Sequence, residues 1–197
     1  GRFNTGGSAG GDAANDWLVL LMPYYQDRGA LTVCPSATRP MVLAGEFATR
    51  AWSWDRAGWA NLKQKETIDI GSYGQNEWIC NRPAEQYWRS RNTIKDPATV
   101  PLFFDCAYVD AYPNHSAGPP PYEGDVSALN EWTLVCMNRH SGYVNHLFAD
   151  LSLRKVGLKE LWTFRWNRTF DIFNIWTPAG HVQPNDWPQW MRGLKDP

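Results

Sequence analysis

The sequence predicts an α+β fold that is mostly β, with an antiparallel meander sheet, short helices and long loops rich in Trp, Pro and Gly. Composition is the first reason. The 197 residues include 12 Trp, 14 Pro and 16 Gly, which favours short elements and ordered loops held by aromatic rings over a helical bundle. The second reason is that apolar runs after residue 100 have the length of strands and are separated by turn residues. The chain length suits one domain with a substantial core.

The N-terminal part of the chain predicts an arm followed by a short helix. Residues 1–15 are rich in Gly, Ser and Ala, and we expect them to form a flexible arm before a single globular domain at 16–197. Residues 16–25 carry apolar side chains at helical spacing. A helix is therefore expected there, and it should bend or end at Pro23.

The next segments predict short extended stretches joined by turns. Residues 30–33 favour a short strand, and residues 46–59 favour an irregular strand pair or a loop. Residues 67–70 are expected to lead into a turn in which Gly71 and Gly74 have a structural role.

Residues 100–109 give the strongest strand prediction, because they are apolar on both faces as a central strand should be. Residues 112–125 contain a Gly-Pro-Pro-Pro run and should form a long exposed loop. The tail at 177–197 is rich in Trp and Pro. It is expected either to pack across the domain or to contact a neighbouring molecule.

The clearest hairpin pattern lies between residues 143 and 156. Residues 143–148 alternate as a strand does and are rich in aromatic and apolar residues. Residues 149–152 supply a turn, and 153–156 resume an extended pattern. Residues 132–137 are expected to pair back on 143–148 as the third strand of a meander. Residues 158–164 then predict a short helix or a last strand.

A His and an Asp flank this hairpin strand and could suggest a catalytic dyad. With the strand rising about 3.3 Å per residue, His140 and Asp150 should lie roughly 25 Å apart, far beyond hydrogen-bond reach. We therefore expect His140, Asp150 and Gly142 to build turns. The sequence contains no H-E-x-x-H or P-loop motif, and we expect no enzyme activity.

Several motifs occur together in a recognisable order. They are CPSATRP at 34–40, GSYGQNEW at 71–78, YWR at 87–89, VPLFFDC at 100–106 and, after His140, VNHLFADLSLRKVGLKELWTFRW at 144–166. Over residues 17–166 this arrangement resembles the planctomycetal prepilin-like proteins, relatives of type II secretion pseudopilins, whose C-terminal motif is His, nine residues, then Asp-Gly. The spacing from His140 to Asp150 fits. The resemblance implies a pilin-like globular domain.

Two features depart from that family. Leu151 stands where the family often has Gly, so the turn after Asp150 cannot rely on a positive φ at low cost. The long apolar N-terminal helix of the family is also missing from this sequence, in which no apolar run is long enough to cross a bilayer. That helix was truncated, removed or never present, and contact with a membrane is expected only through it.

The resemblance to an exported family also bears on the cysteines and on metal binding. The even number of cysteines implies two disulfides, and of three connectivities we favour Cys34–Cys80 with Cys106–Cys136. No other cofactor is expected, but pilin-like domains often carry a structural Ca²⁺ near the C-terminal sheet. The candidate ligands are Asp105, Asp110, Glu123 and Asp125, and ordinary surface carboxylates are the alternative.

The function implied by the resemblance is structural: a subunit of an extracellular or cell-surface filament whose main partner is another copy of itself. Trp176, Trp187 and Trp190 are the candidate assembly residues. The net charge of −1 gives no reason to expect nucleic acid as a partner. Alternatives are a minor pseudopilin that works with other pseudopilins, or a carbohydrate-binding module. The aromatic platforms of such a module would be Trp52, Trp54 and Trp59, or Trp187 and Trp190.

Overall fold

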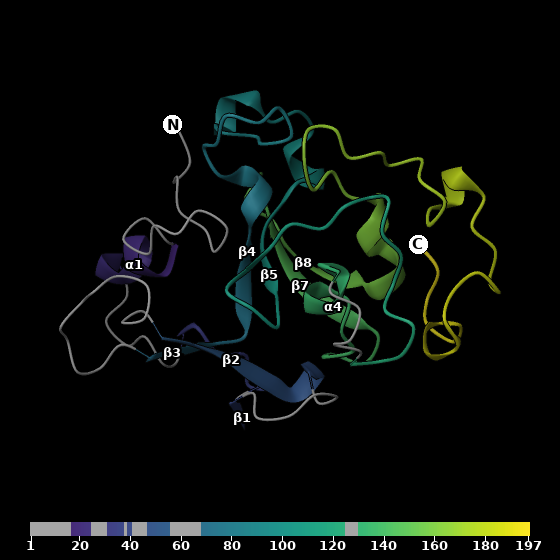
Figure 1. The fold of residues 1–197 in the computed structure, drawn as a ribbon, viewed down its shortest axis with the longest axis horizontal. Coiled ribbons are helices and arrows are strands. Elements are labelled where there is room, and N and C mark those ends of the chain that lie inside the picture. The colour runs from purple at the N-terminus through teal and green to yellow at the C-terminus, as the bar shows by residue number, and fades with distance from the viewer. Residues whose placement is uncertain (1–16, 25–30, 38, 41–46, 56–67, 125–129) are drawn as a thin grey trace.

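The computed structural model describes residues 17–24, 31–37, 39–40, 47–55, 68–124 and 130–197, so the predicted arm at 1–15 lies outside the described residues. A five-stranded sheet in the order β6-β4-β5-β7-β8 forms its centre (Figure 1). The strands are β4 (Tyr73–Asn76), β5 (Pro101–Asp105), β6 (Asp110–Ala111), β7 (Tyr143–Phe148) and β8 (Leu153–Gly157). The middle strand is β5, which confirms the predicted central strand.

The sheet contains the predicted hairpin but not the predicted meander. β7 and β8 pair antiparallel as expected, whereas the other neighbour of β7 is β5. The apolar run at 132–137 forms the short helix α4 (Trp132–Val135) instead of a strand. Such a short run does not distinguish the two structures, and α4 fully buries Trp132 and Val135 on one side. The sheet is also not wholly antiparallel, because β6 runs parallel to β4.

A smaller sheet has the order β1-β2-β3, with β1 (Arg39–Pro40) parallel to β2 (Arg50–Asp55) and β3 (Ile68–Gly71) antiparallel to it. In Figure 1 these strands lie below the large sheet, and the helix α1 (Trp17–Leu21) lies to its left. The 3-10 turn η3 (Met22–Tyr24) ends the helix around Pro23 as predicted. The strand expected at 30–33 is not formed, since its described residues after Leu31 lie in a bend.

The remaining helices are short 3-10 segments that interrupt the loops. They are η4 (Phe47–Thr49), η5 (Glu77–Ile79), η6 (Arg91–Thr93), η7 (Pro97–Thr99), η8 (Leu158–Thr163), η9 (Pro178–Gly180) and η10 (Gln189–Met191). η8 is the short helix expected after the hairpin. Among the described residues, no helix has both the length and the apolar character needed to cross a membrane.

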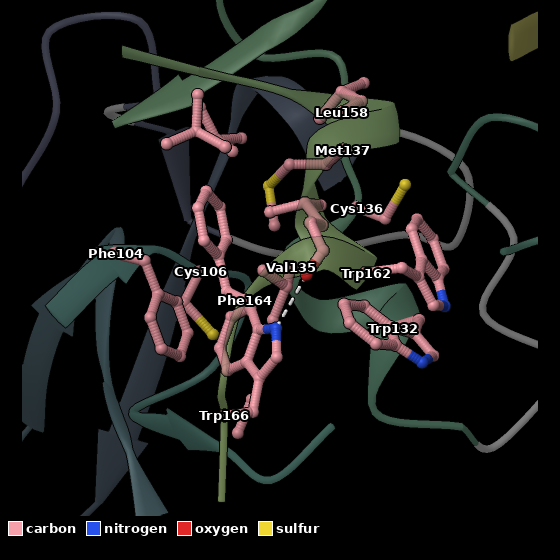
Figure 2. Packing of buried hydrophobic residues seen from close by; sticks show 14 of the residues in the cluster. Phe104, Cys106, Trp132, Val135, Cys136, Met137, Leu158, Trp162, Phe164 and Trp166 are labelled. Atoms are coloured by element: carbon pink, nitrogen blue, oxygen red, sulfur yellow. Dashed lines mark hydrogen bonds between the residues drawn. The ribbon is translucent and has the colours of Figure 1, made fainter. Parts of the chain in front are cut away.

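The main core lies between one face of the large sheet and the C-terminal third of the chain, and it is built largely from aromatic rings. Trp132 of α4 stacks on Trp162 of η8 with ring centroids 4.1 Å apart (Figure 2). Trp166 meets Phe104 of β5 edge to face, at 5.0 Å. Burial of such large rings compensates for the short helices and strands.

The Pro-rich segment is a loop as predicted, over its described residues 112–124, but it is not fully exposed, because Pro113 and Pro120 are buried. Four indole groups hold it in place. The indole N–H of Trp78 donates to the carbonyl of Pro113, Trp132 to Asn114, Trp162 to Ala117 and Trp190 to Pro120, over 2.9–3.1 Å. These bonds satisfy main-chain carbonyls that have no strand partner. The Trp-rich composition thus serves loop order as well as core volume.

The C-terminal tail packs across its own domain. Trp187 is 1% exposed and Met191 is fully buried, both in the main core. The ammonium group of Lys159 in η8 donates to Asp196 Oδ1 at 2.8 Å and to the Leu194 carbonyl at 3.0 Å. The tail is therefore part of the domain.

This packing bears on two predictions about aromatic residues. Trp187 is covered and cannot contact a neighbouring molecule. Trp176 and Trp190 are only half-buried against the same core, so their role in assembly stays a prediction. Of the predicted sugar-platform residues, Trp52 and Trp187 are each 1% exposed and cannot stack on a sugar. The side chain of Trp54 is not described. Trp59 lies outside the described residues.

Candidate functional site

Three side chains from distant parts of the chain meet beside the end of β5. His140 Nε2 lies 3.2 Å from Asp105 Oδ2 and 3.5 Å from Cys34 Sγ. Cys34 and Asp105 are buried, whereas the His140 side chain is 21% exposed. Over the part of the chain that the structure describes, these three form the group of His, Cys and acidic side chains with the spacing to hold a metal ion.

Arg139 contacts the other oxygen of the Asp105 carboxylate. Its Nη1 lies 3.1 Å from Asp105 Oδ1, and both side chains are fully buried. The guanidinium also donates to main-chain carbonyls of Ala48, Arg50, Ser72 and Cys106. A buried charge is costly unless it is paired and hydrogen-bonded. Arg139 meets both conditions and joins three segments of the chain.

The second oxygen of Asp105 is also held by the main chain. The Asn145 N–H donates to Oδ2 at 2.6 Å. The strand pairing of β5 with β7 runs up to Phe104 and His146. The Asp105 side chain therefore takes the place of the next main-chain acceptor, and its carboxylate orientation is fixed by both Arg139 and Asn145.

On the Cys34 side, the contacts run through Ser72. The Cys34 N–H donates to Ser72 Oγ, and the Ser72 N–H donates to the Thr32 carbonyl at 2.8 Å. Burial, together with charge repulsion from Cys34 and Asp105, raises the pKa of the adjacent Tyr73 phenol to about 12. We call these residues the Arg139 cluster: Cys34, Ser72, Asp105, Arg139, His140 and Asn145.

The contacts of His140 limit what the cluster can do chemically. In a thiol-based nucleophilic site, one imidazole nitrogen faces the thiol and the other faces the group that orients the ring. Here Nε2 faces both Cys34 and Asp105. The geometry does not fit a relay from thiol through imidazole to carboxylate, and it suits a shared proton or a bound cation.

The two residues of the His-to-Asp motif have separate roles on either side of β7. The His140 side chain turns toward Asp105, which corrects the predicted turn-building role of that side chain. Asp150 does build its turn, because Oδ1 accepts from the Ser152 N–H at 2.9 Å and from its hydroxyl at 2.7 Å. His140 and Asp150 therefore contact different groups.

The turn and glycine positions show where backbone freedom matters. Leu151 adopts φ of +71° despite its side chain, so the turn after Asp150 takes the conformation that a glycine would take more easily. Gly142 has φ of +89° in the predicted turn. Gly71 and Gly74 instead lie in strands, where a Cβ would come within 2.2 Å of the Trp52 ring and 2.7 Å of the Tyr108 carbonyl, respectively. Their role is close packing.

The predicted disulfides are not formed. All four cysteines are buried, and none is joined to another. Cys34 contacts His140, Cys106 lies against the 108–110 main chain, and Cys136 lies 4.0 Å from the Met191 sulfur. Figure 2 shows Cys106 and Cys136 pointing in different directions. Burial raises the pKa of the Cys106 and Cys136 thiols, so both stay protonated and inert.

The three predicted Ca²⁺ ligands that the structure describes do not come together. Asp105 belongs to the Arg139 cluster, Asp110 is buried in β6, and Glu123 lies in the exposed part of the Pro-rich loop. Asp125 lies outside the described residues. A calcium site needs several oxygen ligands in one place, and the described carboxylates do not provide it.

Comparison with known proteins finds no family model, no curated protein and no solved structure that matches this chain. The sequence motifs and the geometry therefore carry the functional argument. Cys34 and Asp105 stand in quoted motifs, but Ser72, Arg139 and Asn145 were not predicted as site residues. The only signal for them in the sequence is position: Ser72 lies in the motif at 71–78, Asn145 lies in the motif at 144–166, and Arg139 directly precedes His140.

Proposed function

We propose that this chain is the globular domain of a structural subunit of a bacterial extracellular or cell-surface filament, pilin-like and without catalytic activity. The observation that carries the proposal is the convergence of the motif segments. Cys34 comes from the first motif, Ser72 from the second, Asp105 from the strand motif, and Arg139 and His140 precede the hairpin motif. Because the motif residues meet in one buried cluster, the motifs favour a family whose members share a fold and not an active site.

The bonding of the cluster supports a structural role for these residues. The charge of Arg139 is balanced by Asp105, and its donors are used on carbonyls from three parts of the chain. A catalytic group needs access to a substrate, whereas Asp105 and Arg139 have no exposed side-chain surface. The pair is suited to holding segments together.

A filament also needs contacts between subunits, and such head-to-tail contacts use two different surfaces of one molecule. Phe173 and Ile175 are 66% and 70% exposed. Between them, Asn174 is buried and donates to the carbonyls of Trp162 and Asp171, which fixes the backbone. Two apolar side chains on a fixed backbone lose little freedom on docking. We place one subunit contact at Phe173 and Ile175.

The test is negative-stain electron microscopy of the native, untagged protein, together with size-exclusion chromatography over a range of concentrations. Ordered filaments or tubes are the expected result. Phe173→Ser with Ile175→Ser should reduce assembly, and Leu153→Ser, which is 74% exposed on β8, is the matched control. Protein that stays monomeric, alone and with pseudopilins, would overturn the proposal. Incorporation only alongside pseudopilins would assign a minor subunit.

A further inference from the structure

We propose that Cys34, Asp105 and His140 bind one transition-metal ion of the zinc class. The site does not depend on filament formation, since all three ligands come from one chain. Their candidate ligand atoms, a thiol sulfur, a carboxylate oxygen and an imidazole nitrogen, lie within 4.8 Å of one another.

Two of the three separations between the ligand atoms match a tetrahedral metal site. With bond lengths near 2.3 Å to sulfur and about 2.0–2.1 Å to nitrogen and oxygen, a tetrahedron has an S···N edge of about 3.6 Å and an N···O edge of about 3.3 Å. The cluster has 3.5 Å between Cys34 Sγ and His140 Nε2, and 3.2 Å between His140 Nε2 and Asp105 Oδ2. An ion can therefore enter with small movements of the side chains.

A metal ion at this site explains why His140 Nε2 faces both the Cys34 sulfur and the Asp105 carboxylate. A single imidazole nitrogen that faces a thiol and a carboxylate at once cannot serve both as a directed hydrogen-bond donor. A metal ion at the centre of the three atoms bonds to each of them. Sulfur, imidazole and carboxylate together suit Zn²⁺ or Co²⁺ and disfavour Ca²⁺ and Mg²⁺, which require oxygen ligands.

Groups around the ligands hold them in position. Arg139 binds Asp105 Oδ1 and the Asn145 N–H binds Oδ2, which leaves the remaining lone pair of Oδ2 directed toward His140. Ser72 Oγ accepts from the Cys34 main chain. Such outer contacts orient ligands and strengthen metal binding. The ligand geometry is thus set by the fold before an ion binds.

The exposure of the three ligands gives the ion a route to the site. Cys34 is 2% exposed and Asp105 has no exposed side-chain surface, but the His140 side chain is 21% exposed. Solvent therefore reaches the cluster on the His140 side, where a water molecule can complete four ligands. The bound ion would also tie the segment at Cys34 to the sheet.

The experiment is titration of reduced, chelator-treated protein with Zn²⁺ by calorimetry and with Co²⁺ by absorption spectroscopy. We expect one equivalent to bind and Co²⁺ to show a thiolate charge-transfer band. Cys34→Ser and His140→Gln should each weaken binding at least tenfold. Cys136→Ser, a buried thiol against Met191, and His181→Gln, an exposed histidine in the tail, are the controls and should bind as the parent does.

X-ray absorption of the zinc-loaded parent protein keeps the test independent of whether the variants fold. One sulfur ligand with nitrogen and oxygen ligands is the expected coordination shell. A shell without sulfur, no stoichiometric binding, or binding that Cys34→Ser and His140→Gln leave unchanged would overturn the assignment.

Discussion

The guanidinium of Arg139 lies 3.1 Å from the carboxylate of Asp105, and neither side chain has any exposed surface. Arg139 follows α4 and Asp105 ends β5, so the pair joins the C-terminal third of the chain to the central strand. Four main-chain carbonyls complete the surroundings of Arg139. As an isolated buried ion pair it would stabilise the fold little. Its importance is that it holds several segments of the chain together.

Removing one partner of this pair should destabilise the domain strongly. Asp105→Asn leaves the Arg139 charge buried without compensation, and we expect a loss of about 3–5 kcal/mol in the free energy of unfolding. Urea denaturation measures it. Arg165→Gln breaks an exposed pair with Asp96 and should cost less than about 1 kcal/mol. Equal effects of the two substitutions would contradict the role given to Arg139.

His146 should limit stability in acid. Burial lowers its pKa from 6.5 to about 3, with a further contribution from Arg154. Above pH 6.5 the imidazole is neutral in both states. Below that pH the unfolded chain binds a proton that the folded protein does not bind until about pH 3, so stability falls through this window, by roughly 3 kcal/mol at pH 4.5.

Replacing His146 by Phe should remove this acid sensitivity. Neither ring nitrogen of His146 has a hydrogen-bond partner among the described residues, and the ring packs against Phe104, Phe148 and Trp166. We therefore expect a gain of about 1–2 kcal/mol at pH 7. Thermal unfolding from pH 4 to pH 7 would show it. His181→Gln, at an exposed position, should leave the pH profile unchanged; an identical profile for His146→Phe would refute the prediction.

Leu151→Gly should stabilise the protein even though it removes an apolar side chain. Leu151 has φ of +71° and is 62% exposed. Glycine at this position relieves left-handed backbone strain of about 1–2 kcal/mol. The greater conformational entropy of glycine in the unfolded chain offsets part of this gain. Leu153→Gly in β8 is the control and should destabilise by about 0.5–1 kcal/mol. Chemical denaturation of both variants distinguishes them by sign.

Trp187→Ala should destabilise the whole domain, because the tail is part of the core. The ring is 1% exposed and packs against Trp162 and Trp176, and its loss is expected to cost about 3–5 kcal/mol. Phe173→Ala, at an exposed ring, should change stability little. Calorimetric melting of the two variants is the measurement. A small effect at Trp187 would mean that the tail detaches without cost.

The sequence predicted those parts of the fold that depend on local pattern. Residues 143–157 form a hairpin because their alternation and turn chemistry are read within one segment, and the apolar run at 100–109 becomes the central strand for a similar reason. The helix at Trp132 was missed, since its short apolar run fits a strand equally well and only the surrounding rings decide between the two.

The candidate site was harder to predict than the fold. Asp105 was chosen as a calcium ligand and Cys34 as half of a disulfide, so both residues were singled out but given other partners. Their partners are decided by tertiary contacts: His140 is distant from Cys34 in sequence yet lies 3.5 Å away. No prediction was made for Arg139. Arginine is rarely fully buried unless it is paired, and its partner Asp105 lies 34 residues earlier in the chain.

The position of Arg139 along the chain has a consequence for how the domain folds. Its partners at Ala48, Ser72 and Asp105 all precede it in the sequence. When the chain is synthesised from its N-terminus, Asp105 and the carbonyls of the first half are made well before Arg139, which donates to all of them. Contacts of such large sequence separation slow folding. We therefore expect fragments that end before Arg139 to stay open, and the complete chain to fold late and in one cooperative step.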